Sequence, residues 1–435
     1  MTHRRQLRTI QGTVALRDLR SISEEEYRAA VGVFQAIQSL IERRPSEIAR
    51  RGGAVVGYPD KNWKPEGNPS DFFRFTAHVL QDTPSYEVIN RLRFFTGGFS
   101  GVPLLGREWT YENYLSTYRH YSTERYDALL RQRVFDAMRF SLNDFRAAIR
   151  DLPEEFIVKP PRLLGEIGWQ VGETVVNFDT YSYQERAVLL YESGVLNWLR
   201  ERERANGTLT FLEIGGGYGA LALYLKRLFP SARYLIVDLP ESLFFSATYL
   251  GLVDPQAEQT IYTGADSHTL RTNAPGYTFI PNYVFEDVVT AGMPVDLALN
   301  TLSFHEMSSA QVRQYAKGIK ALLGREGVLY EQNGAPPPGD AFGCDPEPIL
   351  AEELFCERFT PRLITPQRGV PRLWSSIPRD EMIERRFKPL SGRTFAAEAI
   401  MARRWVEQQV NQWKRSRWLL PLRQLKRVSR PWAGR

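Results

Sequence analysis

The sequence of 435 residues contains only two cysteines, Cys344 and Cys356. A disulfide framework needs several paired cysteines, so this scarcity excludes a small fold held together by disulfides. Histidine is also rare, with five in the chain, and no pair stands at a metal-ligand spacing such as His-x-x-x-His. We therefore expect two reduced thiols and predict no metal centre.

Long apolar runs are missing as well. The chain has no stretch of about eighteen consecutive apolar residues, which is the length a membrane-spanning helix needs. Residues 1–20 are polar and basic, and they lack the apolar core of a signal peptide. These absences predict a cytoplasmic protein.

Acidic residues are almost absent from the last part of the chain. Residues 403–435 contain ten Lys or Arg and one acid, a net charge of +9, whereas the whole chain carries +6. Four of the nine tryptophans lie in the same segment. Cations interleaved with tryptophan suit an interfacial helix on an anionic membrane, so we expect peripheral contact with the inner face of the membrane. A helix packed on the body with a solvated basic face fits the pattern equally well, and we expect no nucleic acid partner.

The most informative segment that is present covers residues 209–219, which read LTFLEIGGGYG. Its apolar residues predict a buried parallel strand, and residues 220–228 predict a helix directly after the glycines. Glycines allow positive φ and let a ligand approach the backbone closely. This strand, turn and helix together predict a nucleotide-binding site.

A second predicted strand, residues 233–238, ends in Asp238, nineteen residues after Gly219. An acid at the tip of this strand is suited to bind ribose hydroxyls. Spaced as Gly215-x-Gly217-x-x-Ala220, the glycines permit a dinucleotide such as NAD. Spaced as Glu213-x-Gly215-x-Gly217-x-Gly219, they resemble motif I of class I S-adenosylmethionine (SAM) methyltransferases, which we favour.

The later segments resemble the same class. Residues 296–307 predict a fourth strand that runs into a polar loop, residues 311–323 a helix, and residues 327–332 a fifth strand. The run Phe304–Ser308 resembles the loop that carries the catalytic histidine in plant phenolic O-methyltransferases. With segments 165–169, 177–186, 211–240 and 300–307, the chain resembles a bacterial family of sugar O-methyltransferases over about residues 160–335.

The resemblance implies an α/β fold with a Rossmann-like, seven-stranded class I methyltransferase sheet, preceded by a largely helical N-terminal region. The last two strands, expected near 358–364 and 371–376, would pair antiparallel at the edge of this sheet. The expected domains are a helical region at 1–160, the methyltransferase domain at 161–400 and the basic tail at 401–435.

The resemblance also implies SAM as the cofactor. Glu213 would lie near its methionine end, Asp238 would accept its ribose hydroxyls, and Leu239 would pack on its adenine. The full set of expected cofactor-binding residues is Glu213, Gly215, Gly216, Gly217, Gly219, Asp238, Leu239 and Asn300.

The implied acceptor is a sugar hydroxyl, of a surface polysaccharide or of its lipid-linked precursor. A hydroxyl is a weak acid, so its methylation needs a base, and histidine titrates near neutrality. We predict His305 as this base, with Glu306 as its rival and Glu331 as the residue that orients the imidazole. The expected acceptor-site residues are Tyr181, Tyr183 and Arg186, although aromatic residues at such spacing also fit a core.

Two alternatives stay open on the sequence alone. One is an NAD(P)-dependent sugar-nucleotide oxidoreductase, although such enzymes usually carry the glycine fingerprint at the start of the chain. The other is a methyltransferase fold that serves as a non-catalytic binding subunit. The intact glycines and Asp238 argue against the second.

Overall fold

The computed structural model describes residues 152–334 almost completely and the rest of the chain only in part. The described residues are 13–15, 19–52, 56–57, 79–95, 142, 145–146, 148–150, 152–166, 168–171, 174–264, 269–271, 274–334, 344–359 and 370–377. Every histidine except His305 lies outside these residues, and so does the tail 403–435.

The N-terminal region begins with a long helix, α1 (Glu24–Arg50). It starts at a capping box: the Ser23 hydroxyl accepts from the Glu26 N–H, and the Glu26 carboxylate accepts from the Ser23 N–H. Two short helices follow, α3 (Tyr86–Asn90) and α4 (Leu92–Phe95). The helical character of the described part of this region is therefore confirmed.

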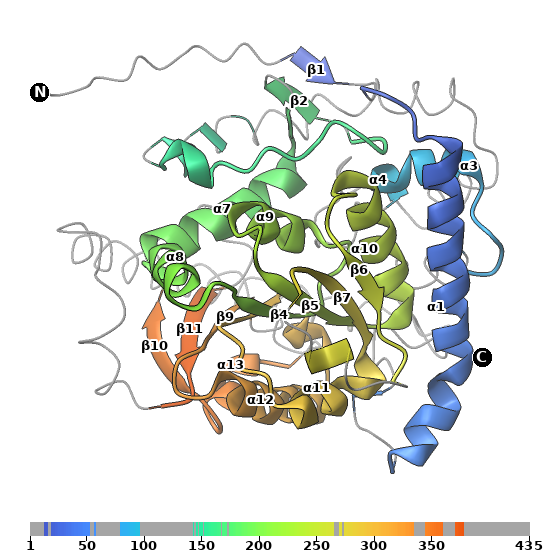
Figure 1. Ribbon diagram of the computed structural model, residues 1–435. Coiled ribbons are helices and arrows are strands. Elements are labelled where there is room, and N and C mark those ends of the chain that lie inside the picture. The colour runs from blue at the N-terminus through green and yellow to red at the C-terminus, as the bar shows by residue number, and fades with distance from the viewer. Residues whose placement is uncertain are drawn as a thin grey trace, which may run out of the picture.

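A sheet of eight strands forms the centre of the molecule (Figure 1), in the order β10-β11-β9-β8-β4-β5-β7-β6. The strands are β4 (Thr210–Ile214), β5 (Arg233–Asp238), β6 (Gln259–Ile261), β7 (Gly276–Pro281), β8 (Leu297–Thr301), β9 (Val328–Asn333), β10 (Phe355–Phe359) and β11 (Val370–Ser375). Strands β4 to β9 pair in parallel, and β11 pairs antiparallel with both β9 and β10. Seven of these strands give the expected class I order with its antiparallel edge, and the short strand β6 adds an eighth beside β7.

The order in which successive strands are added to this sheet reverses between β4 and β8. From β4 it runs outward through β5 and β7, and it then returns to place β8 on the other side of β4. In open parallel sheets a ligand binds at such a switch point, beside the carboxyl ends of the strands. The topology therefore places the candidate site at the ends of β4, β5 and β8.

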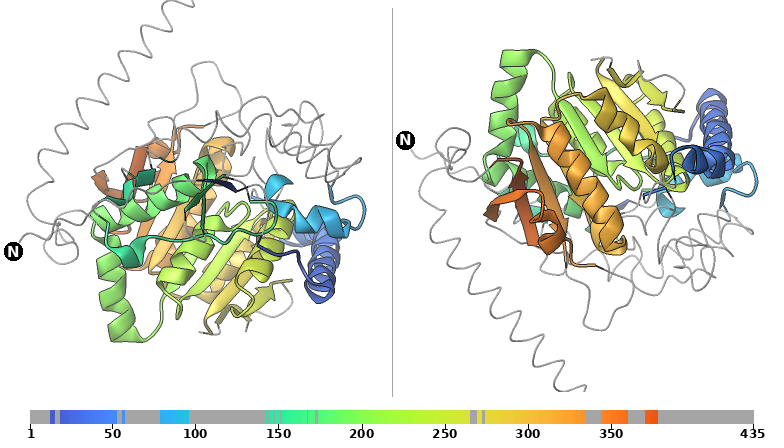
Figure 2. Two further views of the ribbon diagram at one scale, coloured as in Figure 1. Left: turned by 90° about the horizontal axis from the view of Figure 1, so that it is seen from above. Right: turned by 90° about the horizontal axis from the view of Figure 1, so that it is seen from below.

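Helices cover both faces of the sheet, giving three layers (Figures 1 and 2). One face carries α7 (Phe178–Glu192), α8 (Val195–Asn206), α9 (Ala220–Leu228) and α10 (Pro240–Val253), and the other carries α11 (Phe285–Ala291), α12 (Ser309–Leu323) and α13 (Pro346–Leu350). Alternate residues of a strand point to opposite faces. Phe211 therefore packs in the hydrophobic core beneath α7 to α10, and Leu212 packs in the core beneath α11 to α13. The apolar run of β4 is buried on both sides for this reason.

The remaining elements are short. A small antiparallel sheet contains β1 (Thr13–Ala15), β2 (Gly168–Val171) and β3 (Thr174–Val176). The described residues also form four 3-10 turns: η2 (Glu154–Phe156), η3 (Thr269–Arg271), η4 (Asn282–Val284) and η5 (Phe304–Glu306). Among the helices that the structure describes, none has both the length and the apolar character to cross a membrane.

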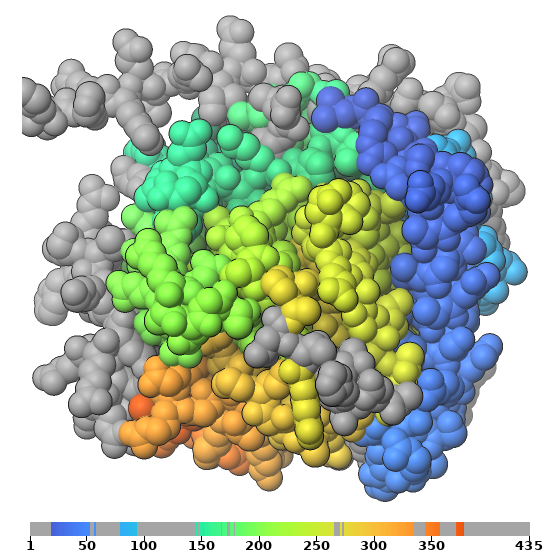
Figure 3. All heavy atoms as spheres, in the orientation of Figure 1, coloured from blue at the N-terminus to red at the C-terminus, as the bar shows by residue number. Residues whose placement is uncertain are grey.

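Helix α1 packs along α10, as the space-filling view also shows (Figure 3). A buried ion pair joins Arg44 to Glu241 at 2.5 Å, and the Phe34 and Phe244 rings meet edge to face at 6.1 Å. The Tyr283 hydroxyl also donates to the carbonyl of Leu40 at 2.9 Å. The domain boundary near 160 stays a prediction, and α1 shares its core with the residues beyond it.

Candidate active site

The turn after β4 is built from glycines with left-handed backbone. Gly215, Gly217 and Gly219 have φ angles of +74°, +57° and +88°. A Cβ at Gly215 would lie 2.2 Å from Ser303 Oγ, and one at Gly219 would lie 2.9 Å from Leu250 Cδ1. Gly215 and Gly219 are therefore needed both for the backbone angle and for the close approach of neighbouring elements.

Asp238 holds this turn from the adjacent strand. Its Oδ2 accepts from the Gly217 N–H at 2.9 Å and its Oδ1 from the Leu239 N–H at 2.7 Å. Burial raises the pKa of Asp238 to about 7, although the side chain keeps partial exposure to solvent. The predicted acid thus lies at the end of β5 and directly contacts the glycine turn.

Glu213 lies beneath the turn rather than at its surface. Its side chain is buried, and its Oε2 accepts from the Tyr234 hydroxyl at 2.9 Å. A Cβ at Gly216 would lie 3.5 Å from the same oxygen, so the carboxyl group is directly under the glycine backbone. Burial raises the pKa of Glu213 to about 7. Its predicted influence on the methionine end of SAM would act through the turn.

The end of β8 is joined to the end of β4 by Asn300. Its Nδ2 donates to the Ile214 carbonyl at 2.9 Å, and its Oδ1 accepts from the Phe304 N–H at 3.2 Å. Between Asn300 and Phe304 the chain turns sharply at Leu302, a non-glycine residue with φ +63°. Left-handed backbone at such a residue costs on the order of 1–3 kcal/mol and occurs often at functional sites. This turn carries η5 and His305.

His305 lies partly exposed on η5, with 30% of its side chain accessible. Its backbone N–H and its Nδ1 both lie 3.3 Å from Asn333 Oδ1. The Cys344 N–H donates to the His305 carbonyl at 3.1 Å. The rival Glu306 is 37% accessible, and its Oε1 lies 4.0 Å from His305 Nε2. Both candidate bases are therefore accessible at the same end of the sheet.

Glu331 does not contact His305, which corrects the orienting role that we expected for it. Its carboxylate is fully buried and pairs with Arg372 at 3.2 Å, and its Oε1 accepts from Asn333 Nδ2 at 2.8 Å. Glu331 therefore contacts the imidazole's neighbour, Asn333. Sequence reasoning missed Asn333, and the available signal was its position two residues after Glu331, on the same face of β9.

The three residues expected to line the acceptor site lie inside the core. Tyr181, Tyr183 and Arg186 are 0%, 5% and 2% exposed, on the part of α7 that packs against α9. The Arg186 guanidinium stacks 4.7 Å from the centre of the Tyr183 ring. Their burial favours the core interpretation of this aromatic pattern.

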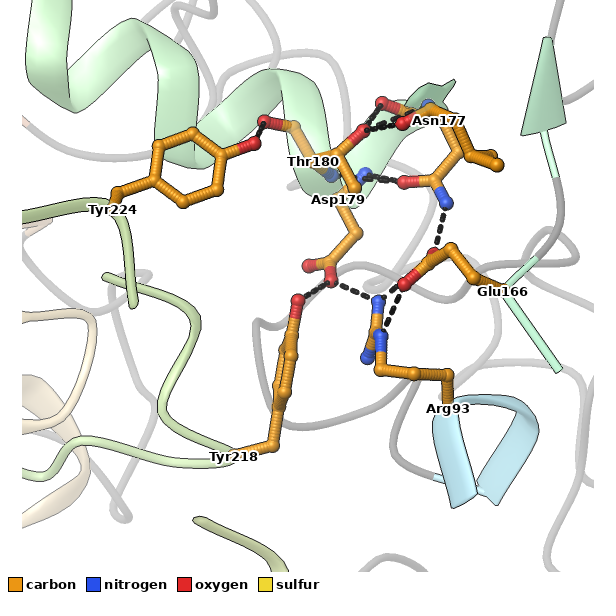
Figure 4. Close-up of polar contacts among 8 residues, drawn as sticks. Arg93, Glu166, Asn177, Asp179, Thr180, Tyr218 and Tyr224 are labelled. Atoms are coloured by element: carbon orange, nitrogen blue, oxygen red, sulfur yellow. Dashed lines mark hydrogen bonds and ion pairs between the residues drawn. The ribbon is translucent and has the colours of Figure 1, made fainter. Parts of the chain in front are cut away.

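A buried polar cluster contacts the glycine turn through Tyr218 (Figure 4). The Arg93 guanidinium pairs with Glu166 and with Asp179, both at 2.6 Å, and it lies 3.8 Å from the centre of the Tyr218 ring. Tyr218 belongs to the turn itself, and its hydroxyl donates to Asp179 Oδ2 at 2.6 Å. Asn177 donates to Glu166 and caps α7. The cluster therefore connects α4, α7 and the glycine turn.

The cluster is fully buried, and its charges are unequal. Arg93, Glu166 and Asp179 are at most 1% exposed, and one cation faces two carboxyl groups. Burial raises the pKa of Glu166, and Arg93 opposes that rise. Among the described residues, no group of three or more His, Cys, Asp or Glu side chains is arranged to hold a metal ion.

Comparison with known proteins gives fold neighbours only. No protein-family model matches the chain, and no curated protein matches it. The pyocyanin biosynthetic protein PhzM has a TM-score of 0.28 at 15% identity, over 46% of this chain and 62% of that one. The mitomycin 7-O-methyltransferase MmcR has a TM-score of 0.26 at 15% identity, over 45% of this chain and 55% of that one.

A third neighbour is an O-methyltransferase family 2 protein from Planctomyces limnophilus, in complex with apigenin. It has a TM-score of 0.29 at 14% identity, over 58% of this chain and 85% of that one. The chain spans less than two thirds of PhzM and of MmcR. Likeness at this level transfers neither an activity nor a substrate, so the fold assignment depends on the strand order of the large sheet.

Proposed function

We propose that this chain is a SAM-dependent O-methyltransferase. The observation that carries the proposal is the convergence of three features at the carboxyl ends of adjacent strands: the glycine turn after β4, Asp238 at the end of β5, and His305 just after β8. A nucleoside-binding turn and an accessible base on neighbouring strands suit transfer between a bound cofactor and an acceptor.

The residues of the turn fit a nucleoside cofactor. Gly215 and Gly217 keep partial exposure to solvent at the turn after β4, where a ligand could reach their backbone, and the partly exposed Asp238 lies beside Gly217. Each carboxylate oxygen has more than one acceptor site, so Asp238 can bind ribose hydroxyls while it keeps its two backbone partners. Leu239 would then pack on the base, and Asn300 would keep the ends of β4 and β8 together.

The chemistry divides between cofactor and protein. SAM, when bound, supplies a methyl group that is already electrophilic. The protein must align the acceptor hydroxyl, which can recover about 7–11 kcal/mol of barrier, and must remove its proton. We assign proton removal to His305, because the imidazole of histidine is the most common general base in enzymes and this one is accessible. The acceptor oxygen would lie next to His305 Nε2.

For the acceptor we propose a sugar hydroxyl of a surface polysaccharide or of its lipid-linked precursor, supported by the resemblance of residues 160–335. The basic, tryptophan-rich segment 403–435 would hold the enzyme at an anionic membrane, where such a precursor would be found. Surface glycans from cells without the protein should lack an O-methyl group by mass spectrometry.

Flotation with anionic liposomes should weaken when residues 403–435 are removed, and unchanged flotation would rule out the membrane role.

Substitution of Asp238 tests the cofactor site directly. Asp238→Ala removes the acceptor for the ribose hydroxyls and the bond to Gly217, so we expect SAM affinity to fall by at least tenfold in calorimetry. Because the pKa of Asp238 is about 7, wild-type affinity for SAM should also decrease as the pH falls below 7 and the carboxylate becomes protonated.

Asp238 lies just before α10, and a matched control, Asp254, lies at the other end of this helix. Asp254 follows α10, and its carboxylate accepts from the Tyr277 hydroxyl at 2.7 Å rather than from the glycine turn, so Asp254→Ala should leave SAM affinity unchanged. Titration with NAD should give no heat. Binding of NAD without binding of SAM would replace this proposal with the oxidoreductase alternative.

A further inference from the structure

The ends of β4, β8 and β9 are connected by side-chain amides whose orientations can be assigned from the backbone. The Ile214 carbonyl can only accept, so the Asn300 group 2.9 Å from it is the donor Nδ2. The Phe304 N–H can only donate, so the Asn300 atom that it meets at 3.2 Å is the acceptor Oδ1. Two independent backbone groups therefore agree on the orientation of Asn300.

The amide orientation of Asn333, which is 1% exposed, can be assigned in the same way. Its Nδ2 lies 2.8 Å from Asn300 Oδ1 and 2.8 Å from Glu331 Oε1, two atoms that accept. Its Oδ1 therefore faces His305, where it accepts from the backbone N–H at 3.3 Å. A flipped amide would set its oxygen against two acceptors and its nitrogen against a backbone donor, which excludes that orientation.

The imidazole nitrogen beside this oxygen must then be a donor. His305 Nδ1 lies 3.3 Å from Asn333 Oδ1, and an amide oxygen can only accept. We propose that Asn333 is a positioning residue that holds neutral His305 in the tautomer with its proton on Nδ1, which leaves the lone pair on Nε2. Nε2 is then the atom that takes a proton from the acceptor hydroxyl, so this inference depends on the proposed function only for its consequence.

The two nearby carboxylates do not compete for this role. Glu306 Oε1 is 4.0 Å from Nε2, which exceeds hydrogen-bond distance, so no hydrogen bond to this carboxylate fixes a proton on Nε2. Glu331 is separated from the imidazole by Asn333 and is neutralised in part by Arg372. An amide fixes the tautomer of histidine without adding a charge beside it, unlike the carboxylate of a Ser-His-Asp triad.

The decisive measurement is which ring nitrogen of His305 carries the proton. We would label histidine with nitrogen-15 in the full-length protein and record the ring nitrogens at a pH where His305 is neutral, assigning its signals by comparison with His305→Gln. Nδ1 should appear as the protonated nitrogen and Nε2 as the unprotonated one. A proton on Nε2, or an even mixture of the two tautomers, would overturn the inference.

Two variants separate Asn333 from the carboxylate behind it. Asn333→Leu is similar in size but removes the oxygen that accepts from His305 Nδ1, so both tautomers of the imidazole should become populated. We expect kcat to fall about ten- to a hundredfold, with no change in KM for SAM. Glu331→Gln keeps an acceptor for Asn333 Nδ2 and should keep the Nδ1–H tautomer. Loss of that tautomer in Glu331→Gln would assign the role to Glu331 instead.

Failure of the inference differs from failure of the proposed function. A protein that binds SAM in calorimetry but carries the His305 proton on Nε2 contradicts the inference alone. A protein that shows the Nδ1–H tautomer but ignores SAM contradicts the proposed function alone.

Discussion

Replacing His305 with alanine is expected to lower methyl transfer by about a hundred- to ten-thousandfold, the range that a general base contributes. SAM affinity should stay the same, because the described contacts of His305 are with Asn333, Cys344 and η5 rather than with the glycine turn. Turnover is measured with labelled SAM and extracted glycan acceptor, and SAM affinity by calorimetry.

Glu306 provides the matched comparison, because it is the adjacent accessible group. Glu306→Gln keeps the size of the side chain and removes the charge, and it should cost much less turnover than His305→Ala if the imidazole is the base. The reverse order would identify Glu306 as the base. Equal loss of SAM affinity in His305→Ala and in Asp238→Ala would show that the division between base and cofactor site is wrong.

Replacing Arg93 with leucine should destabilise the protein by about 3–5 kcal/mol, the cost of removing one partner from a buried ion pair. The substitution leaves Glu166 and Asp179 without their cation at sites that are at most 1% exposed. It also removes the group stacked on Tyr218, so the glycine turn should loosen and SAM affinity should fall. Urea unfolding and calorimetry measure the two effects.

An exposed arginine serves as the control for Arg93. Arg313 pairs with Glu352 at 2.7 Å, but the two side chains are 40% and 48% accessible, so Arg313→Leu should cost far less stability than Arg93→Leu. If Arg93→Leu were equally mild, the cluster would not support the turn. Tyr218→Phe removes only the hydroxyl bonded to Asp179 and should lie between the two.

Features that depend on local pattern could be predicted from the sequence. Ser23 and Glu26 form a capping box because the two side chains are three residues apart on one helix. Gly215 and Asp238 occupy the turn and the strand end because an apolar run, a glycine cluster and a second apolar run can form few other structures. The antiparallel edge strands were expected from the family resemblance and are confirmed at β10 and β11.

Features that depend on distant residues could not be predicted. Tyr181, Tyr183 and Arg186 were expected at the acceptor site because aromatic rings suit sugars, but the packing of α7 on α9 buries them. Glu331 was expected to orient His305, but Arg372 from the neighbouring antiparallel strand pairs with it, and Asn333 contacts the imidazole. Spacing along a strand gives the face of a side chain and does not identify its partner.

The sequence alone determined the first two strands of the nucleotide-binding half and the helix between them, and it identified the glycines and the acid that end those strands, because these depend on periodicity and on backbone angles. Only the tertiary structure decided which buried groups meet. Arg93, Glu166, Asp179 and Tyr218 are separated by up to 125 residues and form one cluster only when α4, α7 and the turn are brought together. Burial makes each unpaired charge costly, so the fold fixes these partners through contacts that no local pattern encodes.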